Sequence, residues 1–207
     1  MLAPLHRRAF WYLRHGETDW NRDGLCQGST DITLNERGLA QAELAAMTIN
    51  WTRVRTIVTS PLRRARQTAD IMAAKAGIVP RIIDDLRECG FGVREGHPFS
   101  GWYDEWRTGR TIPDGAESLS AFLARAARGL NDALQLPGPV LIVAHGGVYW
   151  AVERAAALVA RDAGVARRSA VPNATPIWHE PAADGHTWIR ALPWKTEDYD
   201  RIDAETV

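Results

Sequence analysis

The chain has 207 residues, and its 25 lysine and arginine residues balance 25 aspartate and glutamate residues. This length predicts a single domain over residues 1–207, and the balanced charge excludes a global field that favours nucleic acid or a membrane as partner. No apolar stretch is long enough to span a bilayer, and the first residues lack the apolar segment of a secretory signal. The two cysteines form no C-x-x-C pair, so we expect a reducing, cytoplasmic location.

Apolar runs alternate with longer helical patterns, and this order predicts an α/β fold with a mostly parallel central sheet. Turn and capping residues set the expected boundaries. The elements predicted in the first half are a strand at about residues 9–13, a helix from a capping box at 33–36 toward Asn50, a strand at 56–59, a helix capped by Ser60 that ends before Gly77, and a short strand at 81–83.

The second half begins with a stretch at about 91–117 that has no clear periodicity, and we predict a lid-like excursion over the sheet there. The elements predicted after it are a helix at about 118–136, a buried strand at 140–144, a helix from Gly147 to about Ala163, and a late edge hairpin with strands at 177–178 and 188–191. The polar tail from Glu197 is predicted to be mobile.

Three polar clusters follow three of the predicted strands. They are Arg14-His15, the segment from Ser60 to Arg64, and His145-Gly146. Open α/β sheets bind ligands at the carboxyl ends of their strands, and parallel strands place those ends at one edge. The organisation therefore predicts that the clusters converge on one site.

The residues at this edge suit phosphoryl transfer through histidine. A neutral imidazole can attack phosphorus, and the covalent intermediate divides one displacement into two easier ones. We assign His15 as the nucleophile because Arg14 precedes it and Gly16 allows close backbone approach; the alternative is a buried histidine bonded to a backbone carbonyl. Arg14 and Arg64 are the predicted phosphate clamps, although spacing alone does not separate Arg64 from Arg63.

Two further residues would complete the reaction. His145 is predicted to donate to a phosphate oxygen, with a histidine that merely ends a core strand as the alternative. Glu88 is predicted to protonate the leaving alkoxide and then to activate water. Its alternative is an ordinary solvated carboxylate, and Glu17 and Glu95 are weaker rivals for the role.

Short polar side chains and glycines near the two histidines are predicted to contact the phosphate, with simple turn chemistry as the alternative. These residues are Asn21, Gln27, Gly28, Thr30 and Gly146. Trp102, Tyr103 and Trp106 either wall a substrate pocket or pack in the core. The remaining histidines show no metal-ligand spacing, so no metal site is predicted.

In their order along the chain, these motifs resemble those of the histidine phosphatase superfamily, in the branch shared by cofactor-dependent phosphoglycerate mutases and bacterial phosphatases. The motifs lie within about residues 10–150 and are Arg14-His15-Gly16-Glu17-Thr18, Gln27-Gly28-Ser29-Thr30-Asp31, the segment 59–69, Leu86-Arg87-Glu88 and Ala144-His145-Gly146-Gly147. The resemblance implies helices on both faces of the sheet and a reaction without a metal or other cofactor. For the site it implies a phosphorylated His15 supported by His145, a second phosphate arginine at Arg64, a proton donor at Glu88 and a phosphate contact at Asn21.

The resemblance leaves more than one activity open. Mutases of this superfamily usually carry a longer, basic excursion between Glu88 and His145, and the shorter one here is more like a phosphatase lid. We therefore predict hydrolysis of small phosphorylated metabolites, with a cofactor-dependent phosphoglycerate mutase and a non-catalytic module that binds phosphorylated ligands as alternatives. After His145-Gly146-Gly147, Tyr149 and Trp150 replace the smaller or basic residues often seen in the superfamily, which leaves the substrate open. A homodimer is also left open.

Overall fold

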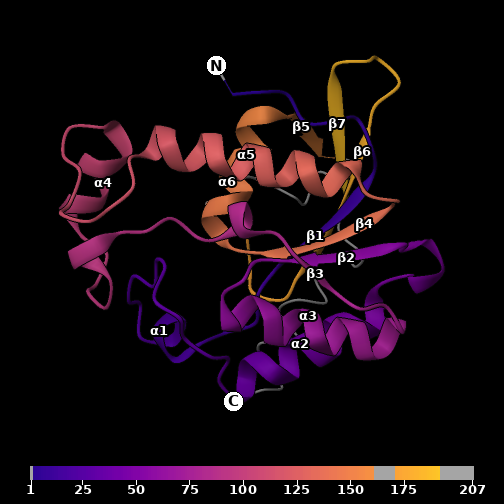
Figure 1. Cartoon of the computed structure of the whole chain (residues 1–207), viewed down its shortest axis with the longest axis horizontal. Helices are drawn as coiled ribbons and strands as arrows, with labels where there is room; N and C mark the ends of the chain where they lie inside the picture. The colour runs from indigo at the N-terminus through magenta and orange to yellow at the C-terminus, as the bar shows by residue number, and fades with distance from the viewer. Residues whose placement is uncertain (1, 161–170, 192–207) are drawn as a thin grey trace.

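A seven-stranded sheet forms the centre of the molecule (Figure 1). The computed structural model describes residues 2–160 and 171–191. The strands are β1 (Phe10–Arg14), β2 (Thr56–Thr59), β3 (Arg81–Ile82), β4 (Val140–Ala144), β5 (Ala157–Ala160), β6 (Pro176–Pro181) and β7 (Thr187–Ala191). Their order is β3-β2-β4-β1-β6-β7-β5, and among these described strands only β6 runs antiparallel to its neighbours. The predicted α/β fold with a mostly parallel sheet is confirmed.

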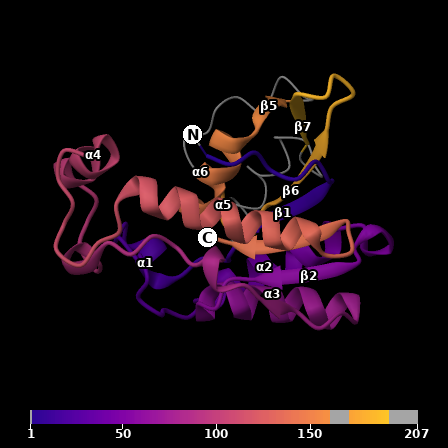
Figure 2. The same ribbon diagram turned by 45° about the horizontal axis from the view of Figure 1, so that its top comes forward.

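Helices cover both faces of the sheet. They are α1 (Asp19–Arg22), α2 (Glu36–Thr48), α3 (Arg63–Ala76), α4 (Gly101–Thr108), α5 (Leu119–Gln135) and α6 (Gly146–Ala155), with 3-10 turns η1 (Trp51–Arg53), η2 (Asp84–Leu86) and η3 (Gly92–Arg94). The helices α2 and α3 pack together on one face, and α5 and α6 pack together on the other (Figure 2). None of the helices within the described ranges is long and apolar enough to cross a membrane.

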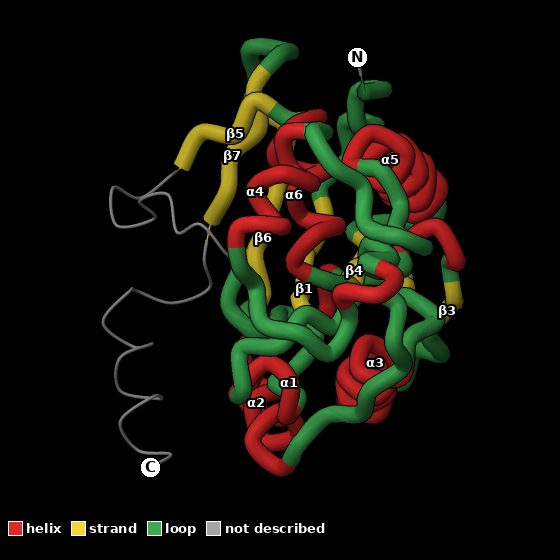
Figure 3. Tube along the Cα trace, turned by 90° about the vertical axis from the view of Figure 1, so that its left-hand side faces the viewer, coloured by secondary structure: helices red, strands yellow, loops and turns green. Residues whose placement is uncertain are grey.

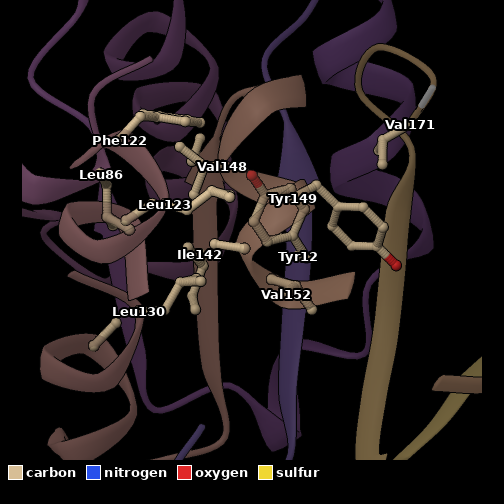
Figure 4. Packing of buried hydrophobic residues seen from close by; sticks show 14 of the residues in the cluster. Tyr12, Leu86, Phe122, Leu123, Leu130, Ile142, Val148, Tyr149, Val152 and Val171 are labelled. Atoms are coloured by element: carbon tan, nitrogen blue, oxygen red, sulfur yellow. The ribbon is translucent and has the colours of Figure 1, made fainter. Parts of the chain in front are cut away.

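The central strand β4 divides its side chains between two cores. Val140, Ile142 and Ala144 belong to the core beneath α5 and α6, whereas Leu141 and Val143 face α2 and α3. Figure 4 shows the first of these cores, with the side chain of Ile142 among side chains of the covering helices. Successive side chains of a strand point to opposite faces, so a strand covered on both sides needs the continuous apolar run seen here.

The parallel register brings the ends of β1, β2 and β4 to one level. Thr59 of β2 pairs with Val143 of β4. The β1–β4 ladder continues past the strand, because the His15 amide donates to the Ala144 carbonyl at 3.0 Å. The chain segments that carry the three polar clusters therefore leave the sheet side by side.

Two helix starts differ from the predictions. The N-cap of α2 is Asn35, whose side chain accepts a hydrogen bond from the Gly38 amide at 2.8 Å, and not Thr33. Helix α3 starts after Leu62, so the predicted cap Ser60 lies outside it. The Ser60 hydroxyl instead accepts from the Leu62 amide at 3.3 Å within the preceding turn.

The segment after α6 is a strand, where the pattern predicted a helix to about Ala163. Strand β5 pairs in parallel with β7, with Ala157 opposite Thr187, so the β6–β7 hairpin lies inside the sheet and not at its edge. Pairing with the free side of β7 outweighs the helix propensity of this alanine-rich segment. The predicted excursion at 91–117 contains η3 and α4, and the tail from Glu197 lies outside the described residues.

Candidate active site

A cavity of about 270 Å³ lies at the carboxyl ends of β1 and β4. Figure 3 shows the helices α1 and α4 on the side of the molecule that faces the viewer. Eight of the ten predicted site residues line the cavity: Arg14, His15, Asn21, Gln27, Gly28, Arg64, Glu88 and Gly146. The other two, Thr30 and His145, do not line the cavity. The convergence expected from strand order is therefore what the structure shows for most of these residues.

His15 is held with one ring nitrogen free. Its Nδ1 lies 2.7 Å from the Gly16 carbonyl oxygen. A carbonyl only accepts, so Nδ1 carries the proton of the neutral ring and Nε2 keeps its lone pair. Burial lowers the pKa of His15 well below its usual value, and the positive charges of Arg64 and Arg14 lower it further. The ring is therefore a neutral imidazole at neutral pH, the form that acts as a nucleophile.

Gly16 sets the position of this histidine through close backbone packing. A Cβ on Gly16 would lie 2.3 Å from the carbonyl oxygen of Gly38, at the start of α2. The Gly16 amide also donates to the Thr68 hydroxyl of α3 at 3.0 Å. The turn after β1 is thus pressed against both helices of one face, which only glycine permits at this distance.

Two arginines line the cavity, and each leaves a buried donor unpaired within the described residues. Arg64 donates from Nη1 to the Thr30 carbonyl at 2.8 Å and from Nη2 to the Gly28 carbonyl at 2.7 Å. Arg14 donates from Nη1 to the Val171 carbonyl at 2.9 Å. In both residues the buried Nε has no hydrogen-bond partner within the described part of the chain. Buried donors are rarely left unpaired, and two guanidinium groups at one cavity favour an anion as ligand.

The structure separates Arg64 from Arg63. Arg64 is completely buried, whereas the side chain of Arg63 is 65% exposed. The Arg63 amide donates to Oδ1 of Asp31 at 2.6 Å, and its Nε lies 3.3 Å from Oδ2. Arg63 thus stabilises the start of α3 from the surface. Burial lowers the pKa of Arg64 to about 10, which still leaves it charged at neutral pH.

This difference gives a matched pair of variants. For the phosphomonoester hydrolysis predicted from the sequence, Arg64→Ala is expected to lower kcat/KM by about 100- to 1,000-fold, since a buried cation that lines the cavity is lost. Arg63→Ala should change it by less than about threefold, as an exposed ion pair contributes little. Steady-state assays on both proteins, with circular dichroism to confirm folding, measure this. Comparable losses in the two variants would remove Arg64 from the phosphate site.

The ring of His145 lies next to that of His15. The two ring centroids are 5.2 Å apart, and the rings are inclined by 59°. The Nε2 of His145 lies 2.7 Å from the Ser60 hydroxyl, and its backbone carbonyl accepts from the Tyr12 hydroxyl at 2.6 Å. Its Nδ1 has no partner among the described residues. Burial, followed by Arg64, lowers the pKa of His145, so this ring is also neutral.

Glu88 lines the cavity with its carboxyl group fixed by two backbone amides. Cys89 donates to Oε1 and Gly147 donates to Oε2, each at 2.9 Å. The two weaker rivals do not line the cavity. Glu17 accepts from the Asn35 side chain at 3.0 Å, and Glu95 accepts from the hydroxyls of the loop before α2. The geometry therefore favours Glu88 among the three predicted carboxylates.

Some residues of the loop after His15 line the cavity, and others support the residues that line it. Asn21 lines the cavity while its Oδ1 accepts from the Thr18 amide at 3.3 Å in a capping box. The buried Gln27 Oε1 has no partner within the described residues. Thr30 does not line the cavity. Its hydroxyl donates to Glu95, and its carbonyl accepts from Arg64. The predicted phosphate contact at Thr30 is therefore replaced by a supporting role.

Two supporting contacts were missed by the sequence analysis. The Asn173 side chain donates to the His15 carbonyl at 2.8 Å from the loop before β6. Arg125 of α5 pairs with Glu117 at 2.6 Å and donates to the Glu88 carbonyl at 3.3 Å. Neither residue belongs to a polar cluster after a predicted strand, so only the distances in the folded chain reveal them.

Acidification is expected to destabilise the protein through its buried histidines. Burial lowers the pKa of His15, of His145 and of His179, the last to about 3. Above about pH 6.5 these groups are neutral in both states. Below that pH only the unfolded chain binds the protons, so the free energy of unfolding falls by up to about 1.4 kcal/mol per pH unit for each histidine.

His179 offers a test of this pH dependence outside the cavity, since it bonds to the Tyr149 hydroxyl at 2.9 Å. His179→Gln keeps a hydrogen-bonding side chain and removes the titration. Denaturant unfolding between about pH 7 and pH 5 should show that the free energy of unfolding falls less steeply with decreasing pH in the variant. The difference in slope should correspond to at most one proton taken up on unfolding. Parallel curves for variant and parent would contradict the assignment of a neutral, buried His179.

Among the described residues, no group of three His, Cys, Asp or Glu side chains is placed to hold a metal ion. The side chains that line the cavity instead include one histidine, two arginines and a carboxyl group, and His145 lies next to His15. Such a set is typical of sites that transfer a phosphoryl group. The family model of the histidine phosphatase superfamily (branch 1) matches residues 10–191. The chain belongs to this superfamily.

Some of its relatives are named as phosphatases and others as phosphoglycerate mutases. A Bacillus subtilis (strain 168) protein named "Uncharacterized phosphatase PhoE" is 39% identical over 145 residues, which cover 68% of this chain and 72% of that protein. A Yersinia pestis (strain Pestoides F) protein named "Probable phosphoglycerate mutase GpmB" is 35% identical over 148 residues, which cover 66% of this chain and 68% of that protein.

The solved structures show the same division. A mycobacterial glucosyl-3-phosphoglycerate phosphatase, solved with VO3, is 30% identical with a TM-score of 0.72, covering 89% of this chain and 98% of that one. A phosphoglycerate mutase from Thermus thermophilus is 32% identical with a TM-score of 0.68, covering 91% and 100%. Phosphoryl transfer is common to both names, and the acceptor differs between them.

Proposed function

We propose that the chain is a phosphomonoesterase that hydrolyses small phosphorylated substrates through a phosphohistidine at His15. The observation that carries the proposal is the lone pair on Nε2 of His15, in a cavity lined by two arginines whose buried Nε atoms have no partner among the described residues. A nucleophile and an anion site thus share one space, and Glu88 lines the same space as a proton donor.

In the first step, Nε2 of His15 attacks phosphorus and forms the P–N bond while the ester P–O bond breaks. The developing charge on the equatorial oxygens is neutralised by Arg14 and Arg64, whose donors are already in place. Glu88 gives its proton to the departing oxygen, which leaves as an alcohol. The fixed orientation of the carboxyl group spares the reorganisation that a mobile side chain would need.

In the second step, water replaces the alcohol beside the ionised Glu88. The carboxylate takes a proton from the water as its oxygen attacks phosphorus, and the P–N bond breaks. Inorganic phosphate leaves, His15 regains its lone pair, and Glu88 is protonated for the next turnover. No group outside the cavity is needed to balance the protons.

Hydrolysis is favoured over mutase chemistry by the charge inside the cavity. A mutase has to retain a doubly phosphorylated intermediate, which needs cations at both ends of the substrate. Within the described residues, the lysine and arginine side chains that line the cavity are Arg14 and Arg64. Both lie beside His15 and serve the phosphoryl group that is transferred.

The test is a product analysis with a panel of phosphomonoesters that includes 3-phosphoglycerate, with and without 2,3-bisphosphoglycerate. We expect release of inorganic phosphate without the bisphosphate and no formation of 2-phosphoglycerate. Interconversion that depends on the bisphosphate, with little phosphate release, would establish the mutase alternative. Tight vanadate binding with no turnover of any ester would establish a binding module.

A further inference from the structure

The outer wall of the cavity is built from aromatic rings. Beyond the two arginines, His15 and Glu88, the lining includes five rings, which are those of Phe91, Phe99, Tyr103, Phe122 and Trp150. They come from the excursion between β3 and α5, from α5 itself and from α6. Within the described residues, the charged side chains of the lining are therefore the two arginines and Glu88, beside the neutral ring of His15, and aromatic rings make up much of the remainder.

The rings form a packed wall. Tyr103 contacts Phe99 edge to face with centroids 4.8 Å apart, and its centroid lies 6.1 Å from that of Trp150. Helix α4, which carries Tyr103, is anchored by the buried Trp106, whose Nε1 donates to the Glu117 carbonyl at 2.8 Å. A wall held in this way is formed before the ligand arrives, so little ordering cost accompanies binding.

Two arginines contact this wall without lining the cavity. The Arg107 guanidinium lies 6.0 Å from the Tyr103 ring centroid and 5.7 Å from that of Trp150. Arg154 lies 6.0 Å from the Trp150 centroid. Neither arginine lines the cavity. Among the described residues, Arg14 and Arg64 are therefore the arginine and lysine side chains that line the cavity, and Arg107 and Arg154 contact the rings without lining it.

Phe99 marks the mouth of the cavity as a surface that a ligand would cover. Its side chain lines the cavity and remains 49% exposed. An aromatic ring that is half in water at the rim of an otherwise apolar cavity gains by contact with an apolar ligand. A polyol or a carboxylate placed there would lose hydration, and the described part of the lining offers no cation besides Arg14 and Arg64.

We propose that the alcohol part of the substrate is a bulky apolar group, aromatic or similarly flat, that packs against this ring wall. The proposal rests on the phosphomonoesterase activity proposed above and names the substrate class for that site. Glycerate and sugar phosphates are then poor substrates, since their hydroxyl and carboxylate groups would face Phe99, Tyr103 and Trp150.

The experiment compares two esters whose alcohols are of similar acidity, 2-phenylethyl phosphate and 3-hydroxypropyl phosphate, so that both need the same help from Glu88. We expect kcat/KM to be at least about 10-fold higher for the phenylethyl ester, since burial of the ring is the difference between them. 3-Phosphoglycerate should be no better than the hydroxypropyl ester. Comparable values for all three esters, or a preference for 3-phosphoglycerate, would overturn the inference and leave the phosphomonoesterase proposal standing.

Matched variants test the wall directly. Phe99→Ala should lower kcat/KM for the phenylethyl ester by about 3- to 10-fold and leave the hydroxypropyl ester nearly unchanged. Ile112→Ala is the control, because this apolar residue of the same excursion is 50% exposed and does not line the cavity. Equal losses on both esters in Phe99→Ala would overturn the inference, since they would show a general effect on the fold. No hydrolysis of any ester by the parent protein would instead refute the proposed function itself.

Discussion

Replacing His15 with asparagine is expected to stop turnover, with kcat lower by at least about 10,000-fold, because the variant has no nitrogen lone pair with which to attack phosphorus. Asparagine still offers an amide that can donate to the Gly16 carbonyl, as Nδ1 of His15 does now. The substitution thus separates the nucleophile from its structural hydrogen bond. Cys89 also lines the cavity, but burial and Glu88 raise the pKa of its thiol, so it stays protonated and does not substitute for the imidazole.

The measurement is capture of the covalent intermediate. Rapid alkaline quenching of the parent protein with a labelled phosphomonoester should leave one phosphoryl group on the peptide that contains His15, because a phosphohistidine survives alkali. His15→Asn should carry no label while retaining vanadate binding at Arg14 and Arg64. Label that persists in His15→Asn, or that maps to His145 in the parent, would exclude His15 as the nucleophile.

The strand ends could be predicted because strand order and residue chemistry agree. Buried parallel strands are continuous apolar runs, and β1 and β4 stand out in the chain for that reason. Each is followed at once by a histidine and a glycine, so one physical rule, that parallel strands end at the same edge, brings His15 and His145 together.

The local sequence could not predict which hydrogen-bond partner a polar side chain would have in the folded chain. Serine is a common helix cap, yet the Ser60 hydroxyl contacts His145 because the fold brings Nε2 of that ring to 2.7 Å from it. The short polar side chain of Thr30 suits a phosphate contact, yet its hydroxyl donates to the Glu95 carboxylate. In each case the deciding partner is distant in sequence, so the choice depends on tertiary geometry that no spacing encodes.

The same reason explains the difference between the two adjacent arginines. Helical periodicity places Arg63 and Arg64 about 100° apart around α3, but which of them faces the sheet depends on how the helix is anchored. Asp31 fixes that choice by accepting from both the amide and the side chain of Arg63. A carboxylate in one loop therefore directs the neighbouring guanidinium into the cavity.

Gly147→Ala is expected to impair catalysis through Glu88. A Cβ at Gly147 would lie 2.2 Å from Oε1 of Glu88 and 3.1 Å from the Phe122 ring. The carboxyl group would have to move, and it would lose the Gly147 amide that donates to Oε2 at 2.9 Å. Since a displaced general acid no longer protonates the leaving oxygen, kcat/KM for an alkyl phosphate should fall by about 100- to 1,000-fold.

The leaving group distinguishes this cause from a general loss of folding. An aryl phosphate has a good leaving group that needs little protonation, so Gly147→Ala and Glu88→Gln should both lose far more activity on alkyl than on aryl esters. Gly146→Ala is the matched control, because among the described residues its Cβ would meet only the Arg14 side chain, at an ordinary 3.7 Å. Its ratio of alkyl to aryl activity should stay within about twofold of the parent ratio, whatever its effect on rate. If Gly147→Ala lowers both ester classes equally while Glu88→Gln changes the ratio, the glycine acts on phosphate binding and not through the carboxyl group.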